Sequence, residues 1–187
     1  MTNIYFVRHA QPDERHADDR TRPLTPLGMS DRERVTEVLE QYHIDAFFSS
    51  PYKRSFDTIA HCAEKRGMAI GTDGRFRERA RGEGSSAFLE KRWADFTVCE
   101  QDGEALGSVQ ARNIEALLEL LRDFADKSLV IGTHGTALST IMNYFDSSCG
   151  IEYFHKIHFC MPYIIRLDFD GAALRGSEEL LRLERGY

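Results

Sequence analysis

"IYFVRHAQP", residues 4–12, carries the clearest indication of the fold of this chain. Its first four residues are apolar, which is typical of a strand buried on both faces of a parallel sheet. The run ends abruptly at Arg8 and His9, which have no acidic neighbour beside them. Ligands of open α/β sheets bind just beyond the carboxyl ends of the strands. We therefore expect a strand over residues 3–8 and ask whether a functional site lies at its end.

Strand-like and helix-like segments alternate along the rest of the chain. Thr25-Pro26 offers a helix N-cap and a first-turn proline, and Gly67 offers a helix end. A tail that alternates apolar and polar residues around Asp170-Gly171 predicts a hairpin of two strands. The periodicity predicts strands over residues 3–8, 44–48, 68–72, 129–131 and two in 157–183, and helices after residue 25 and over 52–67, 104–124 and 137–145. This order predicts an α/β fold with a mostly parallel sheet.

Length and composition favour a single domain over residues 1–187, because the chain is long enough for one core and short for two. The formal net charge of -6 argues against a nucleic-acid surface. No apolar run approaches the ~18 residues of a membrane span, and no secretion signal is evident. We therefore expect a cytoplasmic protein with no nucleic-acid or membrane partner. The four cysteines form no Cys-x-x-Cys pair and are expected to be free thiols, and the oligomeric state stays open.

Three of the predicted strand ends carry similar polar residues. They are Arg8-His9, Ser49-Ser50 with Arg54, and Thr133-His134-Gly135. The carboxyl ends of parallel strands meet at one edge of a sheet, so these residues are expected to converge. The planar fork of arginine matches the oxygens of a phosphate group, and Arg54 lies in a first helical turn, which also favours an anion. The pattern predicts a phosphate cradle that needs no metal.

A histidine in such a cradle can react as well as bind. Neutral imidazole is a competent nucleophile, and the field of two arginines would lower its pKa and keep it neutral near pH 7. Its attack on phosphorus would give a phosphohistidine, while the arginines and the second histidine stabilise the charge of the transferring group. A carboxyl group is also required, first as acid to the leaving oxygen and then as base to water.

Five motifs follow one another between residues 4 and about 138. They read "VRHA", "SSPYKRSFDTIA", "FRERARGEG", "GEALGSVQARNIEALL" and "VIGTHGTAL". Their order and spacing resemble the histidine phosphatase superfamily, also called the phosphoglycerate mutase-like family. The resemblance implies a Rossmann-like three-layer α/β/α sandwich, a phosphohistidine intermediate, and neither metal nor cofactor.

The same resemblance implies a role for each site residue. His9 would be the nucleophile, with Arg8 and Arg54 as phosphate clamps. His134 would be the second histidine, which stabilises the transferring phosphoryl group. Glu78, at the end of the third strand, matches the general acid of the family.

The chain departs from the family pattern at two places. Ala10 replaces the usual glycine after the nucleophile, and because alanine disfavours positive φ we expect this position not to be left-handed. An asparagine that the family often has is replaced by Asp13-Glu14-Arg15, which leaves Gln11 as the candidate for an extra phosphate contact. Gly135, directly after the second histidine, is likewise expected at the bound substrate.

Other residues of the motifs have competing interpretations. Glu83 lies in the same charged run as Glu78 and is a rival general acid, and the arginines of that run could form a solvated loop or a rim for an anionic ligand. Ser50 is most simply a helix cap. His155 and His158 have metal-ligand spacing only on a helix, and because their surroundings look strand-like or irregular we expect no metal site.

Two possible reactions require lids of different size over the active site. A mutase must shield its phosphohistidine from water, whereas the insertion here, about residues 78–104, is small, and Gly82, Gly84 and Gly103 are expected to loosen its ends. Family mutases carry larger insertions. We therefore expect hydrolysis of a phosphomonoester, with a small phosphorylated metabolite as substrate. Phosphoglycerate mutase-type transfer and a non-catalytic phospholigand-binding domain are the alternatives.

Overall fold

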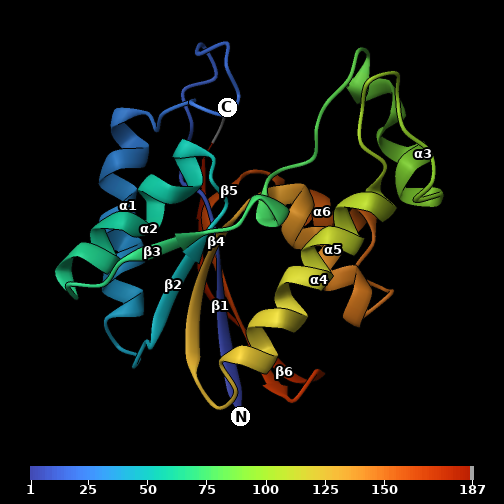
Figure 1. The fold of residues 1–187 in the computed structure, drawn as a ribbon. Coiled ribbons are helices and arrows are strands. Elements are labelled where there is room, and N and C mark those ends of the chain that lie inside the picture. Colours follow the sequence, from blue (N-terminus) through green and yellow to red (C-terminus); the bar gives the residue numbers. More distant parts are fainter. Residues whose placement is uncertain (186–187) are drawn as a thin grey trace.

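Six strands form one sheet in the computed structural model, which describes residues 1–185 (Figure 1). They are β1 (Thr2–Arg8), β2 (Ala46–Ser49), β3 (Ile70–Thr72), β4 (Ser128–Thr133), β5 (Cys160–Asp170) and β6 (Ala173–Glu184). Their order across the sheet is β3-β2-β4-β1-β5-β6. The first four strands run parallel, and β5 runs antiparallel to both β1 and β6. The predicted α/β fold with a C-terminal antiparallel hairpin is confirmed.

Helices cover both faces of the sheet (Figure 1). One face carries α1 (Pro26–Leu39) and α2 (Lys53–Lys65), and the other carries α4 (Leu106–Asp123), α5 (Gly135–Phe145) and α6 (Ile151–His158). The short helices η1 (Gly74–Phe76), η2 (Ser85–Phe88) and α3 (Leu89–Ala94) follow β3, and α3 stands away from the sheet. None of the helices within residues 1–185 is long and apolar enough to cross a membrane.

Strand β1 is apolar throughout because both of its faces are buried. Ile4 and Phe6 pack with the side chains of α4 and α5 in one core. Tyr5 and Val7 point the other way, into a second core with α1 and α2. This alternation of two apolar sets is the physical reason for a continuous apolar run in a central strand.

Helix α1 begins as its sequence predicts. The Thr25 hydroxyl accepts a hydrogen bond from the Gly28 amide at 3.0 Å, and Pro26 occupies the first turn. A Cβ on Gly28 would lie 2.4 Å from the Gln11 carbonyl oxygen, so only glycine lets this turn approach the segment that follows β1. The helix start is thereby packed against the end of the central strand.

Helix α6 differs from what the sequence suggested. We expected strand-like or irregular structure around His155 and His158, with the hairpin beginning at residue 157, but both histidines are helical and the hairpin begins at Cys160. Phe154 and Ile157 are buried on one side of α6. The helix also ends against the Arg8 guanidinium, which donates to main-chain carbonyls of its last turn. The local alternation of apolar and polar residues in the sequence does not reveal either of these tertiary contacts.

The lid, residues 78–104, is fastened by buried charges. Glu100 is fully buried, and its carboxylate accepts a hydrogen bond from Arg79 at 2.6 Å. Arg92 Nη1 approaches the same carboxylate at 3.4 Å, and the Gly82 amide donates to it at 3.0 Å. One carboxylate therefore connects α3 to both ends of the lid.

The lid glycines correct a sequence-based expectation. A Cβ on Gly82 would lie 1.8 Å from the Gln101 carbonyl oxygen, and one on Gly103 would lie 2.6 Å from the Glu100 carboxyl carbon. Of the three, only Gly84 has a positive φ, at 66°. The expectation that Gly82 and Gly103 loosen the lid is therefore wrong, because they are the positions where the chain packs too closely for a side chain.

Candidate active site

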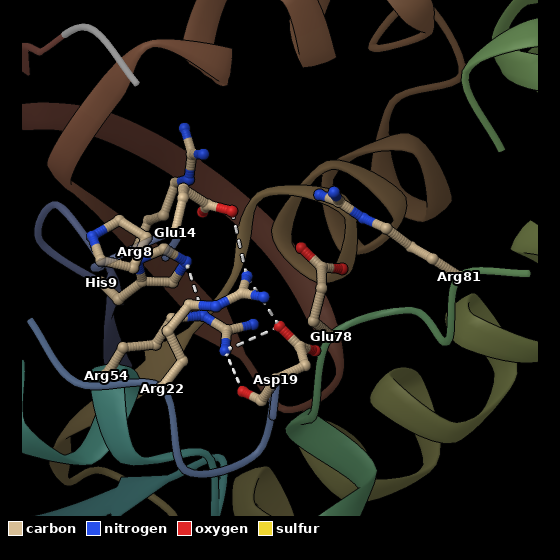
Figure 2. Close-up of a pocket in the computed structure, with 9 residues that line it drawn as sticks. Arg8, His9, Glu14, Asp19, Arg22, Arg54, Glu78 and Arg81 are labelled. Atoms are coloured by element: carbon tan, nitrogen blue, oxygen red, sulfur yellow. Dashed lines mark hydrogen bonds and ion pairs between the residues drawn. The ribbon is translucent and has the colours of Figure 1, made fainter. Parts of the chain in front are cut away.

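A small polar pocket of about 30 Å³ opens at the carboxyl ends of the central strands (Figure 2). Arg8 and His9 come from the end of β1, and Arg54 comes from the first turn of α2. The full lining is Arg8, His9, Pro12, Glu14, Asp19, Arg22, Arg54, Glu78 and Arg81. Four of the five residues predicted to be catalytic thus line one pocket, and the fifth, His134, lies directly behind it against His9.

The ring of His9 is held in one orientation. Its Nδ1 lies 2.8 Å from the Ala10 carbonyl oxygen, and a carbonyl only accepts, so Nδ1 carries the proton. Nε2 then holds the lone pair of the ring, which accepts a hydrogen bond from Arg54 Nε–H at 3.3 Å. The Ala10 amide donates to Thr58 at 2.9 Å, and Ala10 is not left-handed, as predicted.

Burial lowers the pKa of His9 well below its ordinary value, and the charges of Arg54 and Arg8 lower it further. The sequence had predicted the arginine effect, and the structure adds burial as the larger cause. His9 is 5 % exposed. Its imidazole is therefore neutral near pH 7, with Nε2 able to act as a nucleophile.

The two arginines are held in different ways. Arg8 Nη1 donates to the carbonyl oxygens of His158 at 2.8 Å and Cys160 at 3.2 Å. Arg54 donates to the main-chain oxygen of Asp19 at 2.5 Å and pairs with its carboxylate at 3.1 Å. Both guanidinium groups are almost fully buried, so they concentrate positive charge at the pocket.

His134 is the N-cap of α5 and is fully buried, with its ring centroid 5.2 Å from that of His9. Its Nε2 lies 2.8 Å from the Ser50 hydroxyl, which also accepts from the Tyr52 amide at 3.2 Å. Burial lowers the pKa of His134 well below its ordinary value, and Arg54 lowers it further. Ser50 is thus a partner of the second histidine, and the residue at the N-cap of α2 is Tyr52.

Glu78 faces the pocket on the side away from His9 (Figure 2). Its two carboxylate oxygens accept from the amides of Arg79 at 2.7 Å and Thr136 at 3.0 Å. The second of these amides belongs to the first turn of α5, which favours a negative charge. The rival Glu83 is exposed and does not line the pocket.

A loop after β1 that is rich in charges of both signs supplies site residues that sequence reasoning missed. Arg22 enters the pocket, and its Nη1 lies 3.2 Å from both the Glu14 and the Asp19 carboxylates. Asp19 therefore bridges Arg22 and Arg54 (Figure 2). The loop has no periodic pattern, so the only sequence signal was the departure from the family at Asp13-Glu14-Arg15.

Gln11 and Gly135 lie beside the pocket but do not line it. The Gln11 amide oxygen accepts from the Thr25 hydroxyl at 2.8 Å. A Cβ on Gly135 would lie 3.2 Å from the Arg8 guanidinium carbon, so glycine lets α5 start close to this arginine. Within residues 1–185, no group of three or more His, Cys, Asp or Glu side chains could hold a metal ion.

Comparisons with known proteins identify the family. The model of the histidine phosphatase superfamily, branch 1, matches residues 4–177. Phosphoserine phosphatase 1 of Hydrogenobacter thermophilus is 26% identical over 150 residues, which cover 72% of this chain and 71% of that protein.

Two solved structures show the same fold. YhfR of Bacillus stearothermophilus matches with a TM-score of 0.75 and 22% identity over 94% of this chain and 95% of that chain. A mycobacterial glucosyl-3-phosphoglycerate phosphatase in complex with inorganic phosphate matches with a TM-score of 0.73 and 19% identity over 96% of each chain. Because the family model covers nearly the whole sequence, this chain belongs to the histidine phosphatase superfamily, branch 1, and is an enzyme of the phosphoglycerate mutase-like phosphohydrolase kind.

Proposed function

We propose that this enzyme hydrolyses a small phosphomonoester through a phosphohistidine on His9, without a metal ion. The observation that carries the proposal is the pair of hydrogen bonds of the His9 ring, in which Nδ1 lies against the Ala10 carbonyl and Nε2 accepts from Arg54. A neutral, oriented imidazole beside two buried guanidinium groups is what nucleophilic attack on a phosphate dianion requires. The phosphatases among the relatives support hydrolysis as the overall reaction.

Asp19 supports phosphate as the ligand of this pocket. Its carboxylate lies between Arg22 and Arg54 at 3.2 Å and 3.1 Å, so an anionic group occupies the space between the two cations. Asp19 is 48% exposed at its side chain and can move to solvent when a phosphate binds. Arg8, Arg22 and Arg54 would then hold the phosphate oxygens by charge-assisted hydrogen bonds.

The reaction has two balanced halves. The first half requires Glu78 in its protonated form when the substrate is bound: His9 Nε2 forms a bond to phosphorus, the bond from phosphorus to the ester oxygen breaks, and Glu78 gives its proton to the departing alcohol. In the second, the Glu78 carboxylate removes a proton from water, the oxygen of that water attacks phosphorus, and the bond from phosphorus to His9 breaks. Inorganic phosphate leaves, and both residues return to their starting states.

His134 would assist both halves from behind His9. Ser50 accepts a hydrogen bond from an amide, which leaves its own O–H free to donate to His134 Nε2. His134 would then carry its proton on Nδ1, a buried atom with no hydrogen-bond partner among residues 1–185. That N–H is the donor we assign to a phosphoryl oxygen in the transition state. Gln11 and Gly135 would act by shaping the segments around the phosphate.

Phosphate release is the direct test of this function. The wild-type enzyme should release inorganic phosphate from p-nitrophenyl phosphate and phosphoserine, and His9→Ala should abolish release while remaining folded. His61→Ala is the matched control. His61 lies on α2, is hydrogen-bonded to Thr36 of α1, and does not line the pocket. Conversion of 3-phosphoglycerate to 2-phosphoglycerate without phosphate release would favour a mutase. No turnover of any ester with retained phosphate binding would favour a non-catalytic binding domain.

A further inference from the structure

A second, larger cavity of about 600 Å³ adjoins the phosphate pocket. It lies between the lid and the C-terminal part of α6, and Arg81 lines both cavities. Thr136 also lines it, and the Thr136 amide holds the Glu78 carboxylate at 3.0 Å. Glu78 would protonate the leaving oxygen of the substrate, so this oxygen would lie at the mouth of the cavity. The alcohol part of the substrate would then extend into the cavity.

One wall of the cavity is aromatic. The His158 ring centroid lies 5.2 Å from that of Phe154 and 4.7 Å from that of Phe159. Burial, with Arg8 and Arg81, lowers the pKa of His158 to about 4, so this ring is uncharged near pH 7. The three rings, with His155, form a surface suited to stacking or edge contacts with another ring.

The wall formed by the lid carries three arginines, of which Arg81 has no ion pair within residues 1–185. Ser85, Ser86 and Leu89 are small polar or apolar residues. Arg79 and Arg92 also line the cavity, but both are buried against the Glu100 carboxylate. Arg81 also lines the phosphate pocket, so its charge lies where the two cavities meet, and a carboxylate or second phosphate on the alcohol part of a substrate would find the other two arginines of this wall already paired.

We propose that this cavity selects phosphomonoesters whose alcohol carries a planar aromatic ring, which would lie against the wall of Phe154, His158 and Phe159. The proposal rests on the proposed phosphatase function, and it concerns the alcohol and not the phosphate. Cavities of roughly 300–1,000 Å³ with mainly apolar walls enclose ligands of drug size. The alcohols of phosphoserine or phosphoglycerate would fill a small part of the space and leave the aromatic wall uncovered.

Matched substrate pairs test the proposal without changing the leaving oxygen. Adenosine 5′-monophosphate and ribose 5-phosphate are both esters of a primary alcohol, and only the first carries an aromatic base. Benzyl phosphate and ethyl phosphate differ in the same way, with the aromatic ring closer to the phosphorus. We expect kcat/KM, measured by phosphate release, to be at least about tenfold higher for the ring-bearing member of one or both pairs. The pair with the larger ratio reports how far the ring lies from the phosphorus.

Phe159→Ala is the variant that isolates the aromatic wall, because Phe159 is 54% exposed and its truncation should leave the core intact. It should lower the ring-bearing to ring-free ratio of kcat/KM by about fivefold, because only the ring-bearing substrate loses a stacking contact. Tyr144→Ala is the control, since Tyr144 is 52% exposed and does not line either cavity.

The outcomes separate this proposal from the phosphatase function. Equal kcat/KM within both pairs, or a Phe159→Ala enzyme with an unchanged ratio, would overturn the ring preference while the enzyme still released phosphate. Loss of phosphate release from every ester would instead count against the phosphatase function itself.

Discussion

Arginines serve two different purposes in the phosphate pocket and in the lid. In the pocket, Arg8 is held by neutral main-chain carbonyls, and Arg54 is paired with Asp19, a carboxylate that is 48% exposed. In the lid, Arg79 and Arg92 share Glu100, whose side chain is 0% exposed. A partner that can turn to solvent leaves the charge of an arginine available to a ligand, whereas a buried carboxylate does not.

This difference predicts two separable kinds of defect. Changing pocket residues should reduce turnover and change the free energy of unfolding little. Changing the lid carboxylate should do the reverse, because breaking a buried ion pair leaves uncompensated charge in the folded state.

Glu78 lies where the lid begins, and its removal is expected to have the largest effect. Glu78→Gln removes the proton donor while keeping the shape of the side chain. Turnover of alkyl phosphates should fall by about 10²- to 10⁴-fold, the typical contribution of general acid–base catalysis. Release of p-nitrophenolate, which needs no protonation, should be affected much less in its first turnover, measured by stopped-flow absorbance.

Glu83→Gln is the control, because Glu83 was the rival acid and is exposed. A large loss in Glu83→Gln with normal activity in Glu78→Gln would reverse the assignment of the general acid.

Arg54→Lys tests whether the pocket needs a planar fork or only a positive charge. Lysine keeps the charge but cannot make two parallel hydrogen bonds to phosphate oxygens. We expect kcat/KM to fall by about 10²- to 10³-fold, with little change in stability to urea. Arg66→Lys, at the C-cap of the same helix, changes an arginine that donates to the Leu39 and Tyr42 carbonyls and should keep full activity. Equal activity of the two variants would mean that the fork geometry is unimportant.

Glu100→Ala tests the lid side of the comparison. It leaves Arg79 and Arg92 without their buried partner and should lower the free energy of unfolding by about 3–5 kcal/mol in urea titrations. Glu115→Ala removes an exposed partner of Arg75 and should cost less than about 1 kcal/mol. If both variants unfold at the same urea concentration, the buried cluster does not fasten the lid.

The same cluster predicts a dependence of stability on pH. Burial alone would raise the pKa of Glu100, but hydrogen bonds from Arg79 and from backbone amides outweigh it and lower the pKa to about 2. A pKa below the unfolded value of 4.5 stabilises the fold above that pH, and the contribution is lost as the pH falls toward 2. Glu100→Ala should therefore show a shallower loss of stability between pH 5 and pH 2 than the wild type.

The smallest predicted effect is the change in kcat/KM as the pH falls below 7. Because the pKa of His9 is well below its ordinary value, its lone pair stays free as the pH falls below 7. For an ordinary histidine, with a pKa of about 6.5, kcat/KM at pH 6.0 would be about fourfold below its high-pH limit. We expect a loss of less than about twofold in kcat/KM at pH 6.0, once the ionisation of the substrate is taken into account. A fourfold loss would mean that His9 titrates as an exposed residue.

The sequence predicted the pocket better than the lid for a physical reason. Arg8 ends β1, and His9 and His134 directly follow β1 and β4. Both strands have continuous apolar runs, and the topology of a parallel sheet brings such strand ends together. Arg54 was found because a proline and a helix start place it in a first turn. Local pattern and sheet topology together were sufficient for these residues.

The rest depends on contacts between segments that show no pattern. Arg22 and Asp19 lie in an irregular loop, and their place in the pocket is fixed by ion pairs. The role of Gly82 depends on its approach to Gln101 across the lid. The end of helix α6 depends on hydrogen bonds from the Arg8 side chain, which lies 150 residues earlier in the sequence. Such contacts follow from the folded structure and not from local periodicity.

The central claim is that phosphate passes through His9, and direct detection of that intermediate tests it. Glu78→Gln should be mixed with p-nitrophenyl phosphate, quenched in alkali, in which phosphohistidine survives, and digested for mass spectrometry. Because the variant lacks the base that activates water, phosphate should accumulate on the peptide that contains His9. The Glu78→Gln variant that also carries His9→Ala should show none. Phosphate release by the wild type with no phosphate ever found on His9 would contradict the mechanism.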